Sequence, residues 1–260
     1  MSEERDDIRI RECTTVEEYD ECVRLQREAF GLPDLELSPR RHLIVARSAG
    51  GWTLGAFAGE RMVGFVLNQV AVRKSSQTGA EEVIGYSHMM AVAKDYQNRG
   101  VGARLKWAQR ERALAEGRRF IRWTWDPAQS RNAHFNLNRL GVVVRSYAAN
   151  YYGTDYSTVT GRFGEQLGLD SDRLAAEWRL DSPRVEALAR GDAPEPLGEP
   201  AASVPIPPNW SALVREDPGA ARAELRRVRA EFQAALASGL VCAAFDRDPS
   251  QPRYLFYGEW

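Results

Sequence analysis

The chain has 260 residues, which fits one large domain or one domain with an appendage. Its 35 Lys and Arg against 36 Asp and Glu give a formal net charge of −1, so the overall charge offers no argument for nucleic-acid binding. Hydrophobic residues make up 43% of the chain, enough for a packed core, and no apolar run reaches the length of a membrane span.

The amino-terminal part of the chain predicts a strand followed by a helix. Residues 1–7 are charged and lack the apolar region of a secretory signal. Residues 8–11 then alternate between apolar and polar side chains, as a half-buried strand does. Thr15 and Glu18 form a capping box that starts a helix, because their side chains bond the free amides there. Gly31 is expected to end that helix.

The following segment predicts an alternation of helices and strands. Ser38 is the expected N-cap of a second helix, Pro39 suits its first position, and Gly50 ends it. The next expected elements are strands 52–57, 62–67 and 83–92, a helix 103–116, a strand 120–125, a helix 132–140 and a strand 142–147. This order predicts a mixed α/β (α+β) fold.

The sequence changes character near residue 161. Residues 191–208 hold six of the thirteen prolines and are expected to be an extended connection. The other expected elements are a strand 174–180, a helix 218–238 and a closing hairpin 240–245 and 254–257. We therefore divide the chain into a domain of residues 1–160 and a C-terminal extension, residues 161–260, packed on it.

The cysteines indicate a reducing compartment. Cys13, Cys22 and Cys242 are scattered and odd in number, so they form neither a metal-binding spacing nor a disulfide framework. We expect a cytoplasmic protein without a metal site.

The segment from Tyr86 to Gly117 carries the clearest chemistry. A predicted strand leads into Gln97-x-x-Gly100-x-Gly102, which opens a predicted helix. Glycines let the backbone approach an anion closely, and a helix start adds free amides and the positive end of its dipole. Residues 97–122 hold eight basic and two acidic side chains. A tight turn into a helix with a solvated basic face explains this pattern equally well.

Two phosphate-binding motifs are excluded. A dinucleotide-binding fingerprint needs a third glycine, but Leu105 stands at that position. The sequence also lacks the Gly-x-x-x-x-Gly-Lys-Ser/Thr motif of P-loop nucleotide hydrolases.

The motif and its surroundings resemble the acyl-CoA motif of the GNAT superfamily of N-acetyltransferases. The resemblance rests on Met90-Ala91-Val92, a four-residue break and the run from Gln97 to Gly102, with a strand before and a helix after. It covers roughly residues 8–153, and the stretch from Trp123 onward also resembles a bacterial subgroup with a long C-terminal extension. The resemblance implies a mostly antiparallel, splayed central sheet flanked by helices, with a C-terminal helix and hairpin added.

The resemblance implies acetyl-CoA as co-substrate. Amides from Asn98 to Ala103 would hold the pyrophosphate, and backbone groups of Met90 and Val92 would pair with the pantetheine arm. Ser130 stands where the family commonly has an asparagine that contacts CoA, and Asn132 follows two residues later. The implied CoA-binding residues are Met90, Ala91, Val92, Gln97, Asn98, Arg99, Gly100, Val101, Gly102, Ala103, Arg104, Ser130 and Asn132.

His88 is the candidate general base. Strand periodicity places it on one face with Tyr86 and Met90, and relatives carry proton acceptors at the positions of Tyr86 and His88. An imidazole with a pKa near neutrality suits proton removal from an ammonium group. The alternative is a core histidine with a satisfied hydrogen bond. His42, on a predicted surface helix, and His134, near the CoA side, are weaker candidates.

The proton donor is less defined by the sequence. The family often has a tyrosine at the position of Leu137, so another group, or water, would protonate the thiolate. Tyr152, with its neighbour Tyr151, is the nearest candidate, and aromatic packing at a strand end is the alternative. Trp123 and Trp125 share a strand face, where they either line an apolar acceptor pocket or pack in the core.

The resemblance implies transfer of an acetyl group from acetyl-CoA to the primary amine of a small molecule by direct attack, without an acyl-enzyme. One alternative is an N-succinyl or other acyltransferase acting on an amino acid. Another is a non-catalytic acyl-CoA-binding module, which the residue at position 137 favours, and a third is nucleic-acid binding by the basic helix. We expect acyl-CoA and a small amine as partners, with no nucleic acid and no membrane, and leave a homodimer open.

Overall fold

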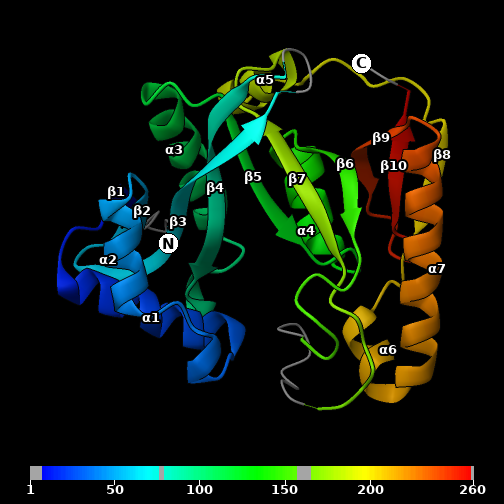
Figure 1. Ribbon diagram of the computed structural model, residues 1–260, viewed down its shortest axis with the longest axis horizontal. Helices are drawn as coiled ribbons and strands as arrows, with labels where there is room; N and C mark the ends of the chain where they lie inside the picture. The colour runs from blue at the N-terminus through cyan, green and yellow to red at the C-terminus, as the bar shows by residue number, and fades with distance from the viewer. Residues whose placement is uncertain (1–7, 76–78, 157–164, 259–260) are drawn as a thin grey trace, which may run out of the picture. The chain divides into compact units, whose positions relative to one another are not determined.

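The computed structural model describes residues 8–75, 79–156 and 165–258, and the chain divides into two compact units. Unit 1 is Met1–Ile121 and unit 2 is Arg122–Trp260. This division differs from the boundary expected at residue 160, which itself lies outside the described residues. The architecture is mixed α/β with a large, mostly antiparallel sheet and flanking helices, which confirms the predicted fold class (Figure 1).

Before Phe120, the described residues of unit 1 form four antiparallel strands in chain order. They are β1 (Ile8–Glu12), β2 (Trp52–Ala58), β3 (Arg61–Lys74) and β4 (Glu81–Val92). The predicted strands 52–57 and 62–67 correspond to β2 and β3, which a hairpin at Gly59 and Glu60 joins; Gly59 takes a φ of 57° that favours glycine. The strands β3 and β4 are longer than the sequence predicted. The added residues include polar ones such as Lys74 and Glu81, which lack the apolar pattern on which the prediction rested.

The helices of unit 1 follow the predicted order. They are α1 (Val16–Phe30), α2 (Arg40–Ser48) and α3 (Val101–Ala115). The capping box of Thr15 and Glu18 is confirmed, and Gly31 ends α1 with a φ of 61°. The prediction of Ser38 as N-cap of α2 is wrong, because Pro39 occupies the N-cap position and no side chain bonds the helix start.

The helices α2 and α3 cover opposite faces of the unit 1 strands. Asn68 and Gln69 are neighbours on β3, so their side chains point to opposite faces. Gln109 of α3 donates to the Asn68 side chain at 3.1 Å, whereas the Gln69 side chain contacts His42 of α2 at 2.7 Å. Each face of β3 therefore carries its own polar network.

Unit 2 holds most of β5 (Phe120–Trp125) and the remaining strands, in the order β5-β7-β6-β9-β10-β8. Those strands are β6 (Val143–Ala148), β7 (Arg173–Arg179), β8 (Ala202–Pro205), β9 (Val241–Asp246) and β10 (Arg253–Tyr257). Its helices are α4 (Ser130–His134), which continues as a π-helical segment (Phe135–Arg139), α5 (Pro183–Arg190), α6 (Trp210–Glu216) and α7 (Pro218–Ala237).

The C-terminal strands complete the sheet around β6. This strand lies before the boundary expected at residue 160, yet it pairs with β7 and β9, which lie beyond it. Phe232 of α7 packs against Tyr147 of β6 at a ring distance of 5.6 Å. Among the described residues, no helix combines the length and the apolar character needed to cross a membrane.

Candidate active site

The turn before α3 has the backbone geometry of an anion cradle. Asn98 and Gly100 both take left-handed conformations, with φ of 64° and 80°. Gly100 is the N-cap of α3 and offers no side chain to the helix start. The amides of Val101, Gly102 and Ala103 precede the first intrahelical bond, which Arg104 N–H makes to the Gly100 carbonyl at 3.1 Å. Donors without a helix partner thus gather at the positive end of the α3 dipole.

The two glycines of the motif have different structural roles. Gly100 needs its left-handed φ, and a Cβ added there meets nothing within 4 Å. Gly102 lies inside α3, where an added Cβ would make an ordinary contact with Met90 Cε at 3.5 Å. The backbone conformation therefore requires glycine only at position 100.

The side chains of three predicted CoA-binding residues contact protein groups near the turn. The Gln97 amide donates to the Val92 carbonyl at 3.2 Å, so it closes the loop between β4 and α3. The Arg99 guanidinium lies 5.2 Å from the ring centre of Tyr96. Arg104 donates to the carbonyl of Ile8 on β1. These contacts shape the cradle from outside, and the contact of the cradle residues with CoA stays a prediction.

His88 occupies a β-bulge in β4. Ser87 pairs with Asn68 and Met89 pairs with Leu67, so His88 is an extra residue without a partner on β3. A bulge redirects the side chain that it carries and is common beside active sites.

The bulge changes which side chains of β4 share a face of the sheet. Tyr86 pairs with Gln69 and Met90 pairs with Val66, and cross-strand partners share a face. Gln69 and Val66 are three residues apart on β3, so Tyr86 and Met90 lie on opposite faces. The expectation that Tyr86, His88 and Met90 share one face is wrong, because the extra residue shifts the alternation by one.

Ser38 and His42 surround the imidazole of His88. The Ser38 hydroxyl lies 3.2 Å from His88 Nε2, and the His42 ring meets the His88 ring edge-on with centroids 5.2 Å apart. Desolvation by neighbouring atoms and the charge of His42 lower the pKa of His88 below its ordinary value. The ring nevertheless remains partly exposed. A neutral, accessible imidazole at neutral pH is suited to accept a proton.

A buried polar network holds the bulge from the α3 side. Lys106 Nζ donates to Ser87 Oγ at 2.8 Å and to Gln109 Oε1 at 3.0 Å, and Gln109 donates to Asn68 Oδ1 at 3.1 Å. Ser87 and Asn68 form the strand pair next to the bulge. Burial lowers the pKa of Lys106 well below the usual lysine value.

The remaining predicted site residues belong to unit 2. Ser130 begins α4, and Asn132 is exposed on it. Leu137 is fully buried in the π-helical segment and supplies no proton donor. Tyr152 is 47% exposed, and its ring lies 4.7 Å from that of Tyr151. The role of Tyr152 as proton donor stays a prediction.

Trp123 and Trp125 pack in the core of unit 2. Trp123 is 8% exposed and meets Trp178 edge-on at 5.7 Å. Trp125 is 4% exposed, and its indole nitrogen donates to the Tyr254 hydroxyl at 3.3 Å. Their contacts favour packing in the core over the other interpretation from the sequence, in which the two rings line an apolar acceptor pocket.

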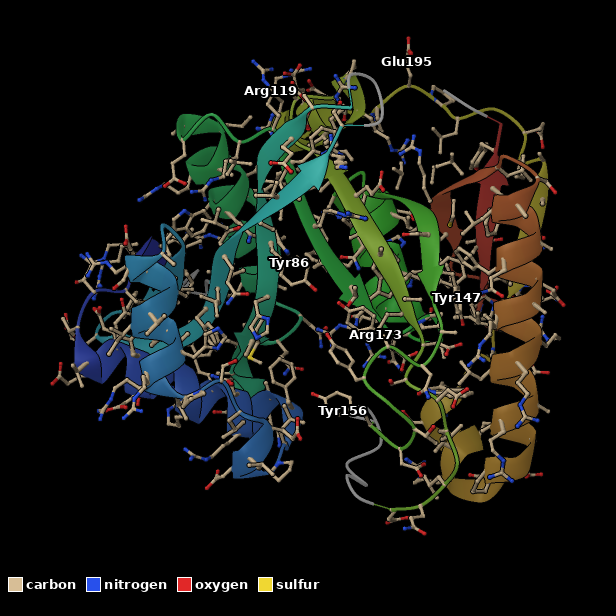
Figure 2. All side chains as sticks on the ribbon, viewed as in Figure 1. Tyr86, Arg119, Tyr147, Tyr156, Arg173 and Glu195 are labelled. Atoms are coloured by element: carbon tan, nitrogen blue, oxygen red, sulfur yellow. The ribbon has the colours of Figure 1, made fainter. Side chains whose placement is uncertain are left out.

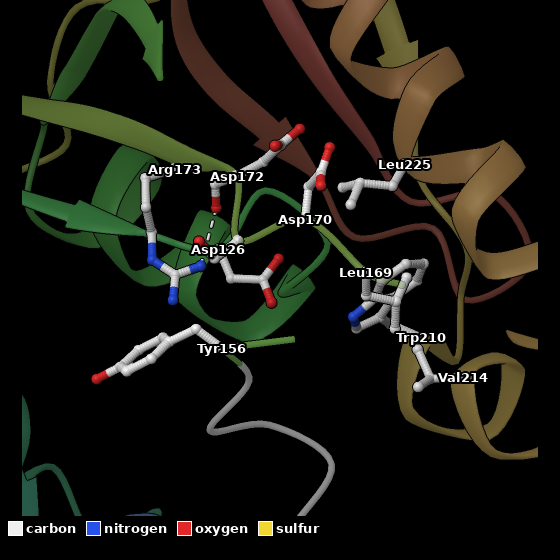
Figure 3. A pocket seen from close by; sticks show the side chains of 10 residues that line it. Asp126, Tyr156, Leu169, Asp170, Asp172, Arg173, Trp210, Val214 and Leu225 are labelled. Carbon is white, nitrogen blue, oxygen red and sulfur yellow. Dashed lines mark hydrogen bonds between the residues drawn. The ribbon is translucent and has the colours of Figure 1, made fainter. Parts of the chain in front are cut away.

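A small pocket of about 20 Å³ in unit 2 is lined by carboxylates and aromatic rings (Figure 3). Its acidic side chains are largely paired: Arg229 bonds Asp170 and Asp172, both at 2.6 Å. Arg173 and Tyr156 also line the pocket, and both are labelled on the whole molecule in Figure 2. A volume of this size holds about one water molecule, so the pocket is too small for an acyl acceptor.

The comparisons with known proteins agree with this geometry. Residues 14–141 match the sequence model of the Acetyltransferase (GNAT) family. No curated protein sequence matches the chain.

Solved structures with the same fold cover about two thirds of the chain. A GNAT-family acetyltransferase of Desulfovibrio desulfuricans is 13% identical with a TM-score of 0.51, and the match covers 66% of this chain and 99% of that one. The ribosomal-protein-S18-alanine N-acetyltransferase of Escherichia coli is 15% identical with a TM-score of 0.51, covering 67% and 95%. A GNAT-family acetyltransferase of Elizabethkingia anophelis with acetyl-CoA bound is 15% identical with a TM-score of 0.47, covering 67% and 99%. The family match shows that the chain carries a GNAT acetyltransferase domain over residues 14–141 and is an N-acetyltransferase.

Proposed function

We propose that the protein transfers an acetyl group from acetyl-CoA to the primary amine of a small molecule by direct attack. The observation that carries the proposal is the continuity of β4 and α3. One strand presents an imidazole at a bulge, and a turn of two left-handed residues then opens a helix with uncapped amides.

The cradle supports a role in binding the CoA pyrophosphate. Free amides and a helix dipole stabilise a doubly charged anion, and the space beside Gly100 is open. In this proposal the residues from Gln97 to Arg104 form the cradle, and Met90, Ala91 and Val92 lie along the pantetheine arm. Ser130 and Asn132 complete the CoA contacts.

His88 acts as general base in the proposed reaction. The imidazole takes a proton from the ammonium form of the acceptor, and the amine nitrogen then attacks the thioester carbonyl. The C–N bond forms, the C–S bond breaks, and the CoA thiolate leaves. Tyr152 or water returns a proton to the thiolate, whose pKa is near that of an ordinary thiol.

Binding of CoA tests the cradle directly. Calorimetric titration with CoA and acetyl-CoA should give a saturable site in the wild type. Gly102→Glu should weaken it strongly, because a carboxylate beside the amides repels the pyrophosphate. Gly258→Glu is the matched control, since it adds the same charge at an exposed position of unit 2. Equal affinity of wild type and Gly102→Glu would place the CoA site elsewhere.

A panel of acceptors then tests the reaction. Thiol release from acetyl-CoA and succinyl-CoA is followed with small amines, amino acids and a peptide α-amine. The peptide is included because one relative is named for a ribosomal-protein alanine. Thiol release with small amines supports the main proposal, and succinyl transfer to an amino acid supports the alternative acyltransferase. Tight acyl-CoA binding with no thiol release across the panel would support a binding module.

The location and domain division belong to the same proposal. Three free, buried cysteines are in keeping with the cytoplasm. We retain an acyl-CoA-binding domain of residues 1–160 with residues 161–260 packed on it, supported by the pairing of β6 with β7 and β9. Light scattering on the purified protein decides between a monomer and a homodimer.

A further inference from the structure

The loop before α2 is fixed by a buried glutamine. Gln26 of α1 is fully buried, and its Oε1 accepts the Ser38 N–H at 2.8 Å. Its Nε2 donates to the Ser38 carbonyl at 3.1 Å and to the Cys22 carbonyl at 3.3 Å. One side chain thus bonds both backbone groups of Ser38, which holds the serine in a single position.

The fixed serine meets the bulged histidine. Ser38 is 7% exposed and does not cap α2, so its hydroxyl is available to His88 Nε2 at 3.2 Å. A buried hydroxyl at this distance orients the imidazole, because it can donate to Nε2 or accept from Nε2–H. If Nε2 carries the proton and donates it to Ser38, the lone pair of Nδ1 is left to accept a proton from a substrate.

A second contact fixes the position of the His42 ring. Gln69 Nε2 lies 2.7 Å from His42 Nε2, and the His42 ring meets the His88 ring edge-on with centroids 5.2 Å apart. In the described part of the chain, His42 is the titratable group whose charge lowers the pKa of His88. The positive charge of Arg40, on the same helix, is paired with Asp20 at 2.8 Å.

We propose that Ser38 and His42 are positioning residues for His88, and that Gln26 and Gln69 act through them. Ser38 accepts from Nε2–H, so that Nδ1 faces the acceptor amine with its lone pair. His42, held in place by Gln69, packs edge-on against His88, and its charge lowers the tendency of His88 to be protonated before the substrate binds. The inference rests on the proposed function, because it names the residues that position the same general base.

Nuclear magnetic resonance tests the arrangement without any substrate. The chain has three histidines, so long-range 1H–15N spectra of the uniformly labelled protein resolve each imidazole, and His88→Gln and His42→Phe assign them. We expect His88 in the Nε2–H tautomer in the wild type and a tautomer mixture in Ser38→Ala. In His42→Phe, the pKa of His88 should rise, because a positive neighbour is removed. Unchanged tautomer and pKa in both variants would overturn the inference.

Kinetics separate this inference from the proposed function. Ser38→Ala should lower kcat about tenfold through misorientation of the base, with an unchanged KM for acetyl-CoA, and Ser38→Thr should restore it. In His42→Phe the acid limb of kcat/KM should move to higher pH. Ser48→Ala is the matched control, because its hydroxyl bonds only the Ile44 carbonyl of α2, at 3.2 Å. Spectral changes without these kinetic effects would support the contacts that position His88 and would refute His88 as the general base. A kcat that falls equally in Ser38→Ala and Ser38→Thr would overturn the role of the hydroxyl.

Discussion

Alanine substitutions at the two glycines of the cradle should have opposite effects on stability. Gly100 has a φ of 80° and a ψ of 0°, and alanine in the left-handed region costs roughly 1–2 kcal/mol. The substitution also restricts the unfolded chain, which offsets about 0.4–1 kcal/mol of that cost. No steric contribution is added, because nothing lies within 4 Å of the new Cβ. Gly100→Ala should therefore lower the free energy of unfolding by about 1 kcal/mol.

Gly102→Ala is the matched control within the same motif. The new methyl group meets Met90 Cε at 3.5 Å and Val92 Cγ2 at 3.9 Å, which are ordinary van der Waals contacts. Alanine in a helix is more stable than glycine by about 0.5–1 kcal/mol. The two variants should thus differ by roughly 2 kcal/mol in the free energy of unfolding, with Gly102→Ala the more stable.

Urea unfolding and CoA titration measure the two effects side by side. Gly100→Ala should also weaken CoA binding, because the strained alanine lowers the population of the left-handed turn in which the amides share a common direction. Gly102→Ala should bind CoA within about threefold of the wild type, a difference below 1 kcal/mol. Equal losses of stability in both variants would refute the conformational argument. Unchanged CoA affinity in a destabilised Gly100→Ala would refute the link between the turn and the ligand.

Three further predictions concern the base, the buried lysine and the C-terminal strands. His88→Gln should lower kcat by about 100-fold or more. In the wild type the acid limb of kcat/KM should lie below the usual histidine pKa of about 6.5, because burial and His42 lower the pKa of His88; a limb above that value contradicts the assignment. The pKa of Lys106 is lowered in the folded protein, so the unfolded chain binds more protons up to about pH 10.4 and stability should rise with pH across that window. Lys106→Met should lose this rise, as urea unfolding at pH 7 and pH 9.5 would show, and parallel curves would argue against a neutral lysine. Deletion of residues 191–260 should give insoluble protein, because it uncovers half-buried rings such as Tyr147 that Phe232 contacts; a soluble, active fragment would contradict the packing role.

Local signals in the sequence predicted the elements well where neighbouring residues determine them. The capping box at Thr15, the stop at Gly31 and the helix predicted over residues 218–238 all depend on residues within a few positions, and the structure confirms each. The helix α5 was missed although its signals are present: Ser182 caps it, Pro183 begins it and Gly191 ends it. The strand β8 falls within the expected proline-rich connection, and it forms because it pairs with β10 as an edge strand.

The candidate site shows where sequence reasoning stops. Position 88 was identified from its residue type and from relatives that carry proton acceptors at the positions of Tyr86 and His88. Ser38 and His42 were assigned to a helix cap and to a surface helix, because their partner lies about 50 residues away in the chain. Lys106 gave no signal of its own, since a lysine in a helix is ordinarily solvated and only packing against β4 buries it.

The sequence by itself determined the order of the elements, the glycine turn that opens α3 and the presence of an imidazole on the preceding strand. Those features depend on local backbone preferences and on spacing along the chain. The tertiary structure alone decided the direction of His88, because the bulge arises from the register between β4 and β3. One extra residue in that register turns His88 toward Ser38 and His42 and turns Met90 toward α3. Pairing between strands, which no local pattern encodes, thus determines which side chains surround the base.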